Sequence, residues 1–220
     1  DSGGLWDEAA VTVNVGDVNE TPSIDDATFA IYEDAANDSN VGTPLVVTDP
    51  DAGDTTAWTI TGGNGAGVFA IDLGTGQITV TDNSTLDFET TPQYVLTVRV
   101  TDFGGLWDEA TVTVDVADVN EAPTVQAAQV FSVAEDAANT TVVGTVLATD
   151  PEDNITAFAI TAGNGDGIFG IDNSGEIAVV DNTNLDFETT NQYVLTIKAT
   201  DAGGLWHEDD VTINVTDVAE

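Results

Sequence analysis

Acidic side chains recur in this sequence in short patterns that suit the binding of a hard cation. Leu-Asp-Phe-Glu stands at residues 86–89 and again at residues 185–188. In an extended segment the two acids of this pattern project to one side and the two apolar residues to the other, because successive side chains alternate. Both carboxylates could therefore face one ion. Ligand sets made only of oxygen select hard cations such as calcium.

The acidic patterns also recur at a fixed spacing along the chain. Asp-Val-Asn-Glu occupies residues 17–20 and 118–121, and Asp-Val-Ala-Glu occupies residues 217–220. Gly-Gly-Leu-Trp begins at Gly3, Gly104 and Gly203, which are 101 and 99 residues apart. A period of about 100 residues matches one compact domain, whereas solenoid units have about 20 to 50 residues. We predict similar domains at residues 21–121 and 122–220, preceded at residues 1–20 by the final strand and linker of another repeat.

The charge of the chain is extreme for a sequence with enough apolar residues to fold. It holds 40 acidic residues against two basic ones, Arg99 and Lys198, and its formal net charge is −38, yet 41% of its residues are hydrophobic. The apolar fraction argues against disorder, and the charge argues against nucleic acid or an acidic membrane surface as a partner. Because the basic side chains cannot neutralise so many carboxylates, we expect inorganic cations to do so.

Covalent cross-links and membrane segments are not expected. The sequence has no cysteine, so neither disulfides nor thiolate metal sites are available, and calcium could take their structural place. It also has no apolar stretch near 18 residues and no charged leader with an apolar core. We therefore expect neither membrane insertion of this segment nor a signal peptide within it.

The local pattern indicates strands throughout. Val112, Val114 and Val116 alternate with polar residues, and the two other copies of this segment do the same, which is the period of a strand with one buried face. Gly, Asn, Asp and Pro separate such segments. The prediction is an all-β fold of tandem seven-stranded Greek-key β-sandwiches, immunoglobulin-like in architecture. The strands expected in the first domain are residues 29–32, 44–48, 57–61, 68–71, 77–81, 94–101 and 108–116, and the second domain repeats this plan.

The order of the acids resembles the cadherin repeat over essentially the whole chain. That family's unit has an acid after its first strand, Asp-x-Asp after its second, a Leu-Asp-Arg-Glu element, Asp-x-Gly after its sixth strand and Asp-x-Asn-Asp-Asn before a proline. The variants Asp-Val-Asn-Glu and Asp-Phe-Glu resemble the bacterial branch of the family, which is found in long surface adhesins. The matching elements are Glu33, Asp49 with Asp51, residues 86–89, Asp102 with Gly104, and residues 118–123.

This resemblance implies three calcium ions at the joint between the two predicted domains. The ligands of the outer ion would be Glu33, Asp87, Glu89 and Glu121. Those of the middle ion would be Glu33, Glu89, Asp118, Glu121 and Glu152 with the carbonyl of Val119. Those of the third would be Asn120, Asp150, Glu152 and Asp201 with the carbonyl of Ala122. Glu121 and Glu152 stand where the family has aspartate, so each of these carboxylates reaches one methylene further.

The resemblance also implies partial sites at the two outer ends. A site of the third type would use Asn19, Asp49, Asp51 and Asp102. One or two ions would bind to Glu135, Asp186, Glu188, Asp217 and Glu220, although Ala219 removes the asparagine ligand of that linker. The alternative is that all these acids are solvated surface residues, which does not explain why they recur at corresponding positions.

Other chemistry fits these residues less well. Paired carboxylates also serve glycosidases, which need a cleft and two environments that separate the two pKa values, whereas here the same pair recurs in each repeat. We therefore do not expect an enzyme. Residues 163–167 resemble a calcium β-roll repeat without its consecutive copies, so a turn is expected there. His207 is the only histidine and replaces Asp108 of the preceding copy, so we do not expect it to bind metal.

Each copy is expected to expose one tryptophan. Strand parity places Trp107 on the face opposite the buried valines, and Trp6 and Trp206 repeat the arrangement. An exposed aromatic ring in every repeat could bind a sugar or a neighbouring chain. The alternative is that each ring lies flat over its own sheet.

We interpret the sequence as a calcium-binding, calcium-rigidified extender or adhesion module of a bacterial cell-surface or secreted repeat protein, with fibre formation as one outcome. Its partners would be calcium and neighbouring repeats or other copies of the protein, and its location would be extracellular. The alternative function is a carbohydrate-binding module that uses the outward tryptophans on a surface glycan. Residues 1–20 would be ordered either by a longer array or by strand addition to another copy.

Overall fold

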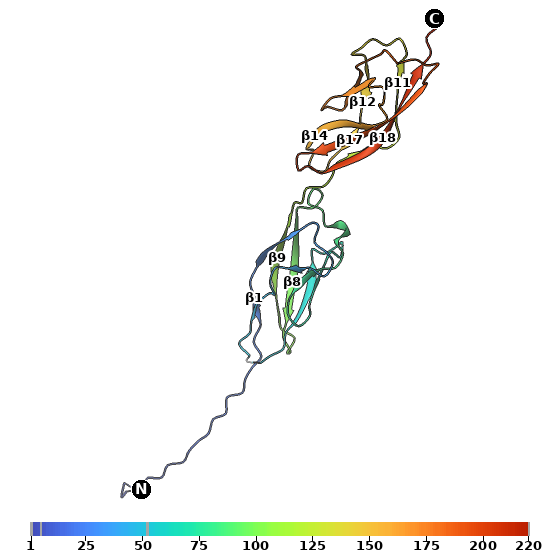
Figure 1. The fold of residues 1–220 in the computed structure, drawn as a ribbon. Helices are drawn as coiled ribbons and strands as arrows, with labels where there is room; N and C mark the ends of the chain where they lie inside the picture. Colours follow the sequence, from blue (N-terminus) through green and yellow to red (C-terminus); the bar gives the residue numbers. More distant parts are fainter. Residues whose placement is uncertain (1, 5, 52, 220) are drawn as a thin grey trace. The chain divides into compact units, whose positions relative to one another are not determined.

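The computed structural model describes residues 2–4, 6–51 and 53–219. The chain divides into two compact units, Asp1–Asp118 and Val119–Glu220, which we call unit 1 and unit 2. The strands of both units are drawn in Figure 1. In the described residues the regular structure is β, apart from the single 3-10 turn η1 (Asn83–Thr85). Among these residues no helix is long and apolar enough to span a bilayer.

Unit 1 is a β-sandwich. Its strands are β1 (Ser23–Ile24), β2 (Ala27–Tyr32), β3 (Asn40–Val41), β4 (Val47–Thr48), β5 (Ala57–Gly62), β6 (Phe69–Ile71), β7 (Ile78–Val80), β8 (Gln93–Thr101) and β9 (Trp107–Ala117). A four-stranded sheet has the order β2-β9-β8-β5 and a three-stranded sheet the order β3-β7-β6, while β1 pairs with β4. β2 runs parallel to β9, and the other neighbours in the larger sheet are antiparallel.

The core of unit 1 follows from the alternation of its strands. In β9 the side chains of Val112 and Val114 are fully buried and the intervening Thr113 is not. Leu96 lies opposite Val112 in the register of β8 and β9, so the same face of both strands supplies the core. Trp58 is also buried in this core. Strands with one apolar face become stable when a second sheet covers that face.

Unit 2 repeats this plan. A four-stranded sheet has the order β11-β18-β17-β14, a three-stranded sheet the order β12-β16-β15, and β10 pairs with β13. The strands are β10 (Thr124–Val125), β11 (Gln129–Ala134), β12 (Val142–Thr145), β13 (Ala148–Thr149), β14 (Ile155–Ala162), β15 (Phe169–Ile171), β16 (Glu176–Val179), β17 (Gln192–Asp201) and β18 (Trp206–Thr216). The ring centroids of Phe169 and Tyr193 lie 5.3 Å apart in a T-shaped contact, as those of Phe69 and Tyr94 do at 5.1 Å in unit 1. The predicted all-β tandem sandwich fold is therefore confirmed.

The first two strands predicted in unit 1 are each preceded by a short strand that was not predicted. Residues 29–32 lie within β2, which pairs with β9, whereas β1 pairs with β4, so the chain changes sheets between β1 and β2. The range 44–48 contains β4, and β3 is separated from it by a segment that contains Gly42 at φ +61° and Pro44. A left-handed residue and a proline both interrupt strand pairing, which explains why β3 and β4 are not one strand.

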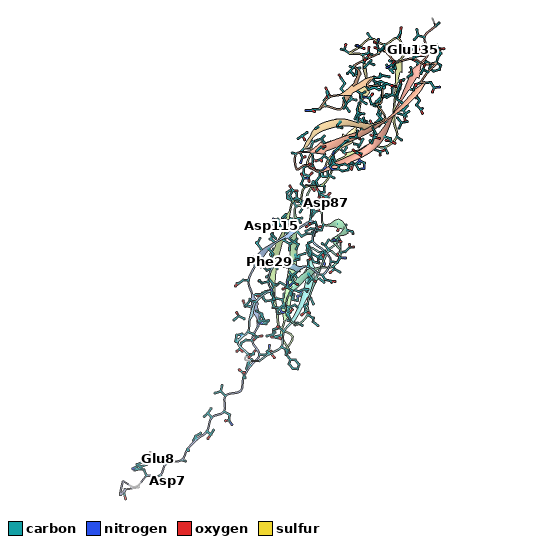
Figure 2. The ribbon with its side chains drawn as sticks, viewed as in Figure 1. Asp7, Glu8, Phe29, Asp87, Asp115 and Glu135 are labelled. Atoms are coloured by element: carbon teal, nitrogen blue, oxygen red, sulfur yellow. The ribbon has the colours of Figure 1, made fainter. Side chains whose placement is uncertain are left out.

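The N-terminal segment does not form the strand that its alternating valines predict. Val11, Val13 and Val15 are 83%, 77% and 92% exposed, and residues 7–18 join no sheet in the described part of the chain. Asp7 and Glu8 lie on this segment, outside the sheets (Figure 2). A strand needs a neighbour for its backbone hydrogen bonds, so alternation alone does not produce one.

Candidate metal centres

Three carboxylates meet where β2 and β9 end in unit 1. Glu33 follows β2 directly, and its oxygen lies within 4.8 Å of oxygens of Glu89 and Asp118. Glu33 is only 7% exposed, and its Oε2 accepts a hydrogen bond from the N–H of Phe88 at 2.7 Å. The parallel pairing of β2 with β9 brings the ends of both strands to one place, so residues far apart in sequence form this group.

Asp87 lies outside this group of three acids, and its predicted role as a ligand of the same ion as Glu89 stays a prediction. Its Oδ1 accepts the N–H of Thr90 at 2.8 Å, and its Oδ2 accepts the Thr90 hydroxyl at 3.0 Å. Residues 88–90 form a turn, so the alternation of an extended segment does not continue from Asp87 to Glu89. Leu86 is nevertheless buried in the core, as the pattern predicted.

Unit 2 has the corresponding group, made of Glu135, Glu188 and Asp217. Glu135 accepts the N–H of Val218 at 2.7 Å through Oε1 and the N–H of Phe187 at 2.9 Å through Oε2. The hydrogen bond from Val218, followed by that from Phe187, holds the pKa of Glu135 below its usual value. This carboxylate is therefore fixed in position and kept ionised.

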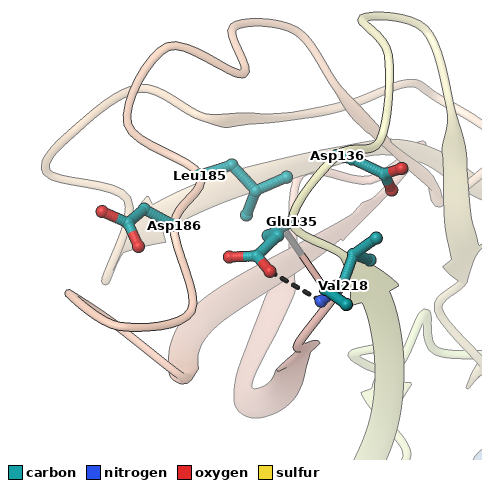
Figure 3. A pocket seen from close by; sticks show the side chains of 6 residues that line it. Glu135, Asp136, Leu185, Asp186 and Val218 are labelled. Carbon is teal, nitrogen blue, oxygen red and sulfur yellow. Dashed lines mark hydrogen bonds between the residues drawn. The ribbon is translucent and has the colours of Figure 1, made fainter.

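A cavity adjoins this group in unit 2. Figure 3 shows Glu135 in it between Leu185 and Val218, with the hydrogen bond to Val218 dashed. Asp186 also lines it, but its carboxylate accepts the hydroxyl of Thr189 at 2.8 Å, and this hydrogen bond lowers the pKa of Asp186. Asp186 thus resembles Asp87 in its bond to a following threonine, while its carboxyl also interacts with that of Glu188 and its charge acts on Glu135. The predicted ligand Glu220 lies outside the described residues.

Two further groups lie at the other end of unit 1. One contains Asp17, Glu20 and Asp51, and the N–H of Glu20 donates to Asp51 Oδ2 at 2.8 Å. A hydrogen bond to the Asp51 carboxyl raises the pKa of Glu20, and the charges of Asp17 and Asp49 act in the same direction. The hydrogen bond and the neighbouring charges favour the protonated form of Glu20, whereas a bound cation would favour its ionised form.

The other group contains Asp49, Asp54 and Asp102, whose oxygens also lie within 4.8 Å of one another. Asp102 is 6% exposed, and its Oδ1 accepts the N–H of Leu106 at 2.8 Å. Its Oδ2 accepts Asn19 Nδ2 at 2.9 Å, so the linker segment is tied directly to this group.

The equivalent end of unit 2 has the same framework. Asp201 is 3% exposed and accepts the N–H of Leu205 and Asn120 Nδ2, both at 2.8 Å. The N–H of Glu121 donates to Glu152 at 3.0 Å. Burial raises the pKa of Asp150, and the charges of Glu152 and Asp201 raise it further.

Buried oxygens in these groups show that the residues fit a cation. Asp49 Oδ2, Asp150 Oδ2 and Glu152 Oε2 are buried, and no donor of the described residues gives them a hydrogen bond. A buried charged oxygen without a donor is costly, and a metal ion is one partner that removes this cost. A set of carboxylate and amide oxygens suits calcium, which takes six to eight oxygen ligands. Calcium would be held by these oxygens and would neutralise their charge.

The sequence missed three members of these groups. Asp17 is the counterpart of Asp118 and Asp217, and Glu20 is the counterpart of Glu121 and Glu220, so the linker repeat would have revealed both. Asp54 has no such signal, because the residue at its position in unit 2 is Asn154. The carbonyls of Val119 and Ala122 remain predicted ligands.

The two basic residues of the chain cover exposed tryptophans. Arg99 Cζ lies 4.1 Å from the centroid of the Trp107 ring, and Lys198 Nζ lies 4.4 Å from that of Trp206. Both rings are about half exposed, as strand parity predicted, and Trp6 is 76% exposed. Each ring of the two units is thus held by a cation from the neighbouring strand of its own sheet. This arrangement does not favour the alternative of a sugar-binding platform.

His207 has a structural partner. Its Nδ1 accepts the N–H of Val125 at 3.2 Å, and Asp108 Oδ2 accepts the N–H of Ile24 at 3.1 Å in unit 1. Both side chains therefore fasten the first short strand of their unit.

Known proteins share this repeated design. The model of the Cadherin domain family matches residues 27–117 and 129–216, which is most of both sandwiches. The chain belongs to the cadherin family. The predicted family membership is confirmed, and cadherin domains are extracellular adhesion repeats, which supports an extracellular adhesive module.

Individual cadherins are similar over nearly the whole chain. Protocadherin-like wing polarity protein stan of Drosophila melanogaster is 36% identical over 96% of this chain, and human Protocadherin Fat 1 is 34% identical over 93%. The chain spans only 6% and 5% of these two relatives. Mouse Cadherin-23 EC22-24 superimposes with a TM-score of 0.68 at 27% identity, covering 91% of this chain and 65% of that one. Human Protocadherin-24 EC1-2 gives 0.67 at 25% identity, covering 90% of this chain and 100% of that one.

Proposed function

We propose that this cadherin chain is a calcium-binding, calcium-rigidified extender and adhesion module of a larger surface or secreted repeat protein. The observation that carries the proposal is the pair of buried, hydrogen-bond-free oxygens at corresponding positions, Asp49 Oδ2 in unit 1 and Asp150 Oδ2 in unit 2. Solvated surface acids would not leave such oxygens buried in both units.

Electrostatics favours the same conclusion. Two like charges 4 Å apart repel by about 4 kcal/mol at an effective dielectric constant of 20. The acids of each group have oxygens within 4.8 Å of one another, and the net charge of the chain is −38. A divalent cation in each group removes this repulsion, whereas monovalent salt only screens the exposed part of it.

Rigidity would come from the linker contacts. In unit 1, the Asn19 side chain donates a hydrogen bond to Asp102, and the N–H of Glu20 donates one to Asp51, which belongs to a different loop. An ion shared by these loops would hold residues 17–20 against the sandwich, and removing it would leave mutually repelling acids. In this proposal calcium therefore stiffens the chain where a repeat joins its linker.

The proposed partners are neighbouring repeats or other copies of the protein, with filament formation as one consequence. The proposed source is a bacterial surface adhesin. That part rests on the Asp-Val-Asn-Glu and Asp-Phe-Glu variants of the family pattern at residues 17–20, 118–121, 87–89 and 186–188.

Thermal unfolding and titration calorimetry of the 220-residue chain test calcium binding. At a hundredfold excess over Kd, each site adds about 2.7 kcal/mol to the free energy of unfolding. We expect calcium to raise Tm in 150 mM NaCl and a chelator to reverse the change. Magnesium at the same concentration is the control, since it demands a tighter octahedral geometry and should act weakly. Identical melting curves with calcium and chelator, together with no binding heat, would overturn the proposal.

A further inference from the structure

The two units differ at two positions of otherwise matching sites: Glu152 replaces Asp51 and keeps the charge, whereas Asn154 replaces Asp54 and removes it. Ala57 pairs with Thr101 in unit 1, and Ala157 pairs with Thr200 in unit 2, so these alanines are structurally equivalent. Three residues before them stand Asp54 and Asn154. The rest of the framework is shared, because Asp49 and Asp102 correspond to Asp150 and Asp201, and Asn19 corresponds to Asn120.

In unit 1 the differing residue is a third carboxylate of the group. The oxygens of Asp49, Asp54 and Asp102 all lie within 4.8 Å of one another. Asp102 is anchored by Asn19 and Leu106, and Asp49 presents its buried Oδ2 without a hydrogen-bond donor. A cation in this group would meet three negative charges.

In unit 2 the corresponding side chain, Asn154, forms hydrogen bonds with other residues of the same unit. Asn154 Oδ1 accepts the N–H of Ala202 at 3.0 Å, and Asn154 Nδ2 donates to Asn120 Oδ1 at 3.4 Å. The neighbouring acid Asp153 does not replace the missing charge. It is exposed, has φ +54° and belongs to none of the carboxylate groups found in the described residues.

We propose that the two sites bind calcium with graded affinity, the Asp54 site of unit 1 filling at lower calcium concentration than the Asn154 site of unit 2. This inference rests on the proposed calcium binding. Calcium affinity is set largely by the number of charged ligands, and unit 1 supplies one more carboxylate than unit 2 from the same framework. As calcium rises, the chain responds in two steps, with unit 1 ordered before unit 2.

Each site has a built-in reporter. The N–H of Leu106 donates to Asp102 and that of Leu205 donates to Asp201, both at 2.8 Å. Binding of an ion to either aspartate will change the chemical shift of the attached amide. A calcium titration of the isotopically labelled full chain, followed by NMR, therefore reads the two sites separately.

The test exchanges the two residues. In the wild type we expect the Leu106 amide to reach its midpoint at a calcium concentration on the order of tenfold below that of Leu205. Asp54→Asn should move the Leu106 midpoint upward by a similar factor, and Asn154→Asp should move the Leu205 midpoint downward. The double variant should reverse the order. Asp7→Asn is the control, because it removes one charge from the exposed N-terminal segment and should move neither midpoint.

Failure of this inference is distinguishable from failure of the proposed function. If both amides respond to calcium at one concentration in the wild type and in both single variants, the grading is wrong while calcium binding stands. If neither amide responds and calorimetry detects no binding, both the proposed calcium binding and the proposed difference in affinity are wrong. The two substitutions act on different units, so a folding defect in one variant leaves the other as an independent test.

Discussion

Asn19 and Asp102 are 83 residues apart in the sequence and are joined by a 2.9 Å hydrogen bond from Nδ2 to Oδ2. Asn120 and Asp201 form the same bond at 2.8 Å in unit 2. Since Asp102 and Asp201 are both buried, each asparagine compensates a charged group that would otherwise lose its contact with water. These pairs connect each linker to the last hairpin of its sandwich, which makes them a direct target for mutation.

Asn120→Ala should lower the free energy of unfolding in chelator by about 1.5 to 3 kcal/mol, because it leaves a buried carboxylate short of a donor. Urea unfolding measures the change. Asn173→Ala in an exposed turn is the control and should cost less than about 0.5 kcal/mol. A loss at Asn120 no larger than that of the control would show that the hydrogen bond contributes nothing to stability.

Glu33→Gln separates the hydrogen bond of Glu33 from its charge. Glutamine can still accept the N–H of Phe88, so stability in chelator should be unchanged or slightly higher. The stabilisation by calcium should fall by the contribution of one site, about 2.7 kcal/mol at a hundredfold excess over Kd. Melting curves of Glu33→Gln and the wild type, with calcium and with chelator, test this, and an undiminished calcium effect in the variant would remove Glu33 from the ligand set.

Asp72→Asn should reduce the dependence of the free energy of unfolding on pH in the acidic range. The Thr75 hydroxyl, followed by the N–H groups of Thr75 and Gly74, lowers the pKa of Asp72. A lowered folded-state pKa contributes stability above the ordinary pKa of the group, and this stability is lost as pH falls through the folded-state pKa. Asparagine keeps the acceptor without titrating. We therefore expect the urea midpoints of variant and wild type, measured between pH 2 and 7 in chelator, to differ least at low pH. At higher pH the wild type should gain stability that the variant does not gain.

Gly42→Ala should be strongly destabilising. Gly42 has φ +61°, and a Cβ at this position would collide with the ring of Phe29, which packs against the core. We expect the free energy of unfolding to fall by about 1 to 2 kcal/mol because of the backbone conformation and by about 1 to 3 kcal/mol more because of overpacking. Gly67→Ala is the matched control, because Gly67 has φ +71° with open space around its Cβ position and should show the backbone cost alone.

Arg99 and Trp107 should be energetically coupled. A cation over an exposed aromatic ring contributes about 0.5 to 1 kcal/mol, and Arg99 also forms an ion pair with Glu109 at 2.9 Å. A double-mutant cycle of Arg99→Gln and Trp107→Leu isolates the ring contact from that ion pair. A coupling energy near zero in urea unfolding would mean that the cation and the ring merely lie side by side.

Local patterns were sufficient to predict the architecture. The alternation in β9 and β18, the turn residues between strands and the repeat of about 100 residues indicated tandem sandwiches, because the burial period of a strand is written in its own residues. The recurrence of Glu33 and Glu135, or of Asp102 and Asp201, likewise marked positions at strand ends where acids gather. These features need no knowledge of which strands pair.

What the sequence by itself determined was the class of fold, the repeat and the residue types that could bind a hard cation. The tertiary structure alone decided that Glu89 joins a carboxylate group while Asp87 turns to Thr90, and that Asp54 completes a group whose counterpart in unit 2 contains Asn154. It also decided that β1 and β2 belong to different sheets. The physical reason is that Glu89, Asp54, β1 and β2 are placed by contacts between segments distant in sequence, which local spacing does not specify, whereas Asp87 is placed by the turn at residues 88–90, which strand alternation does not predict.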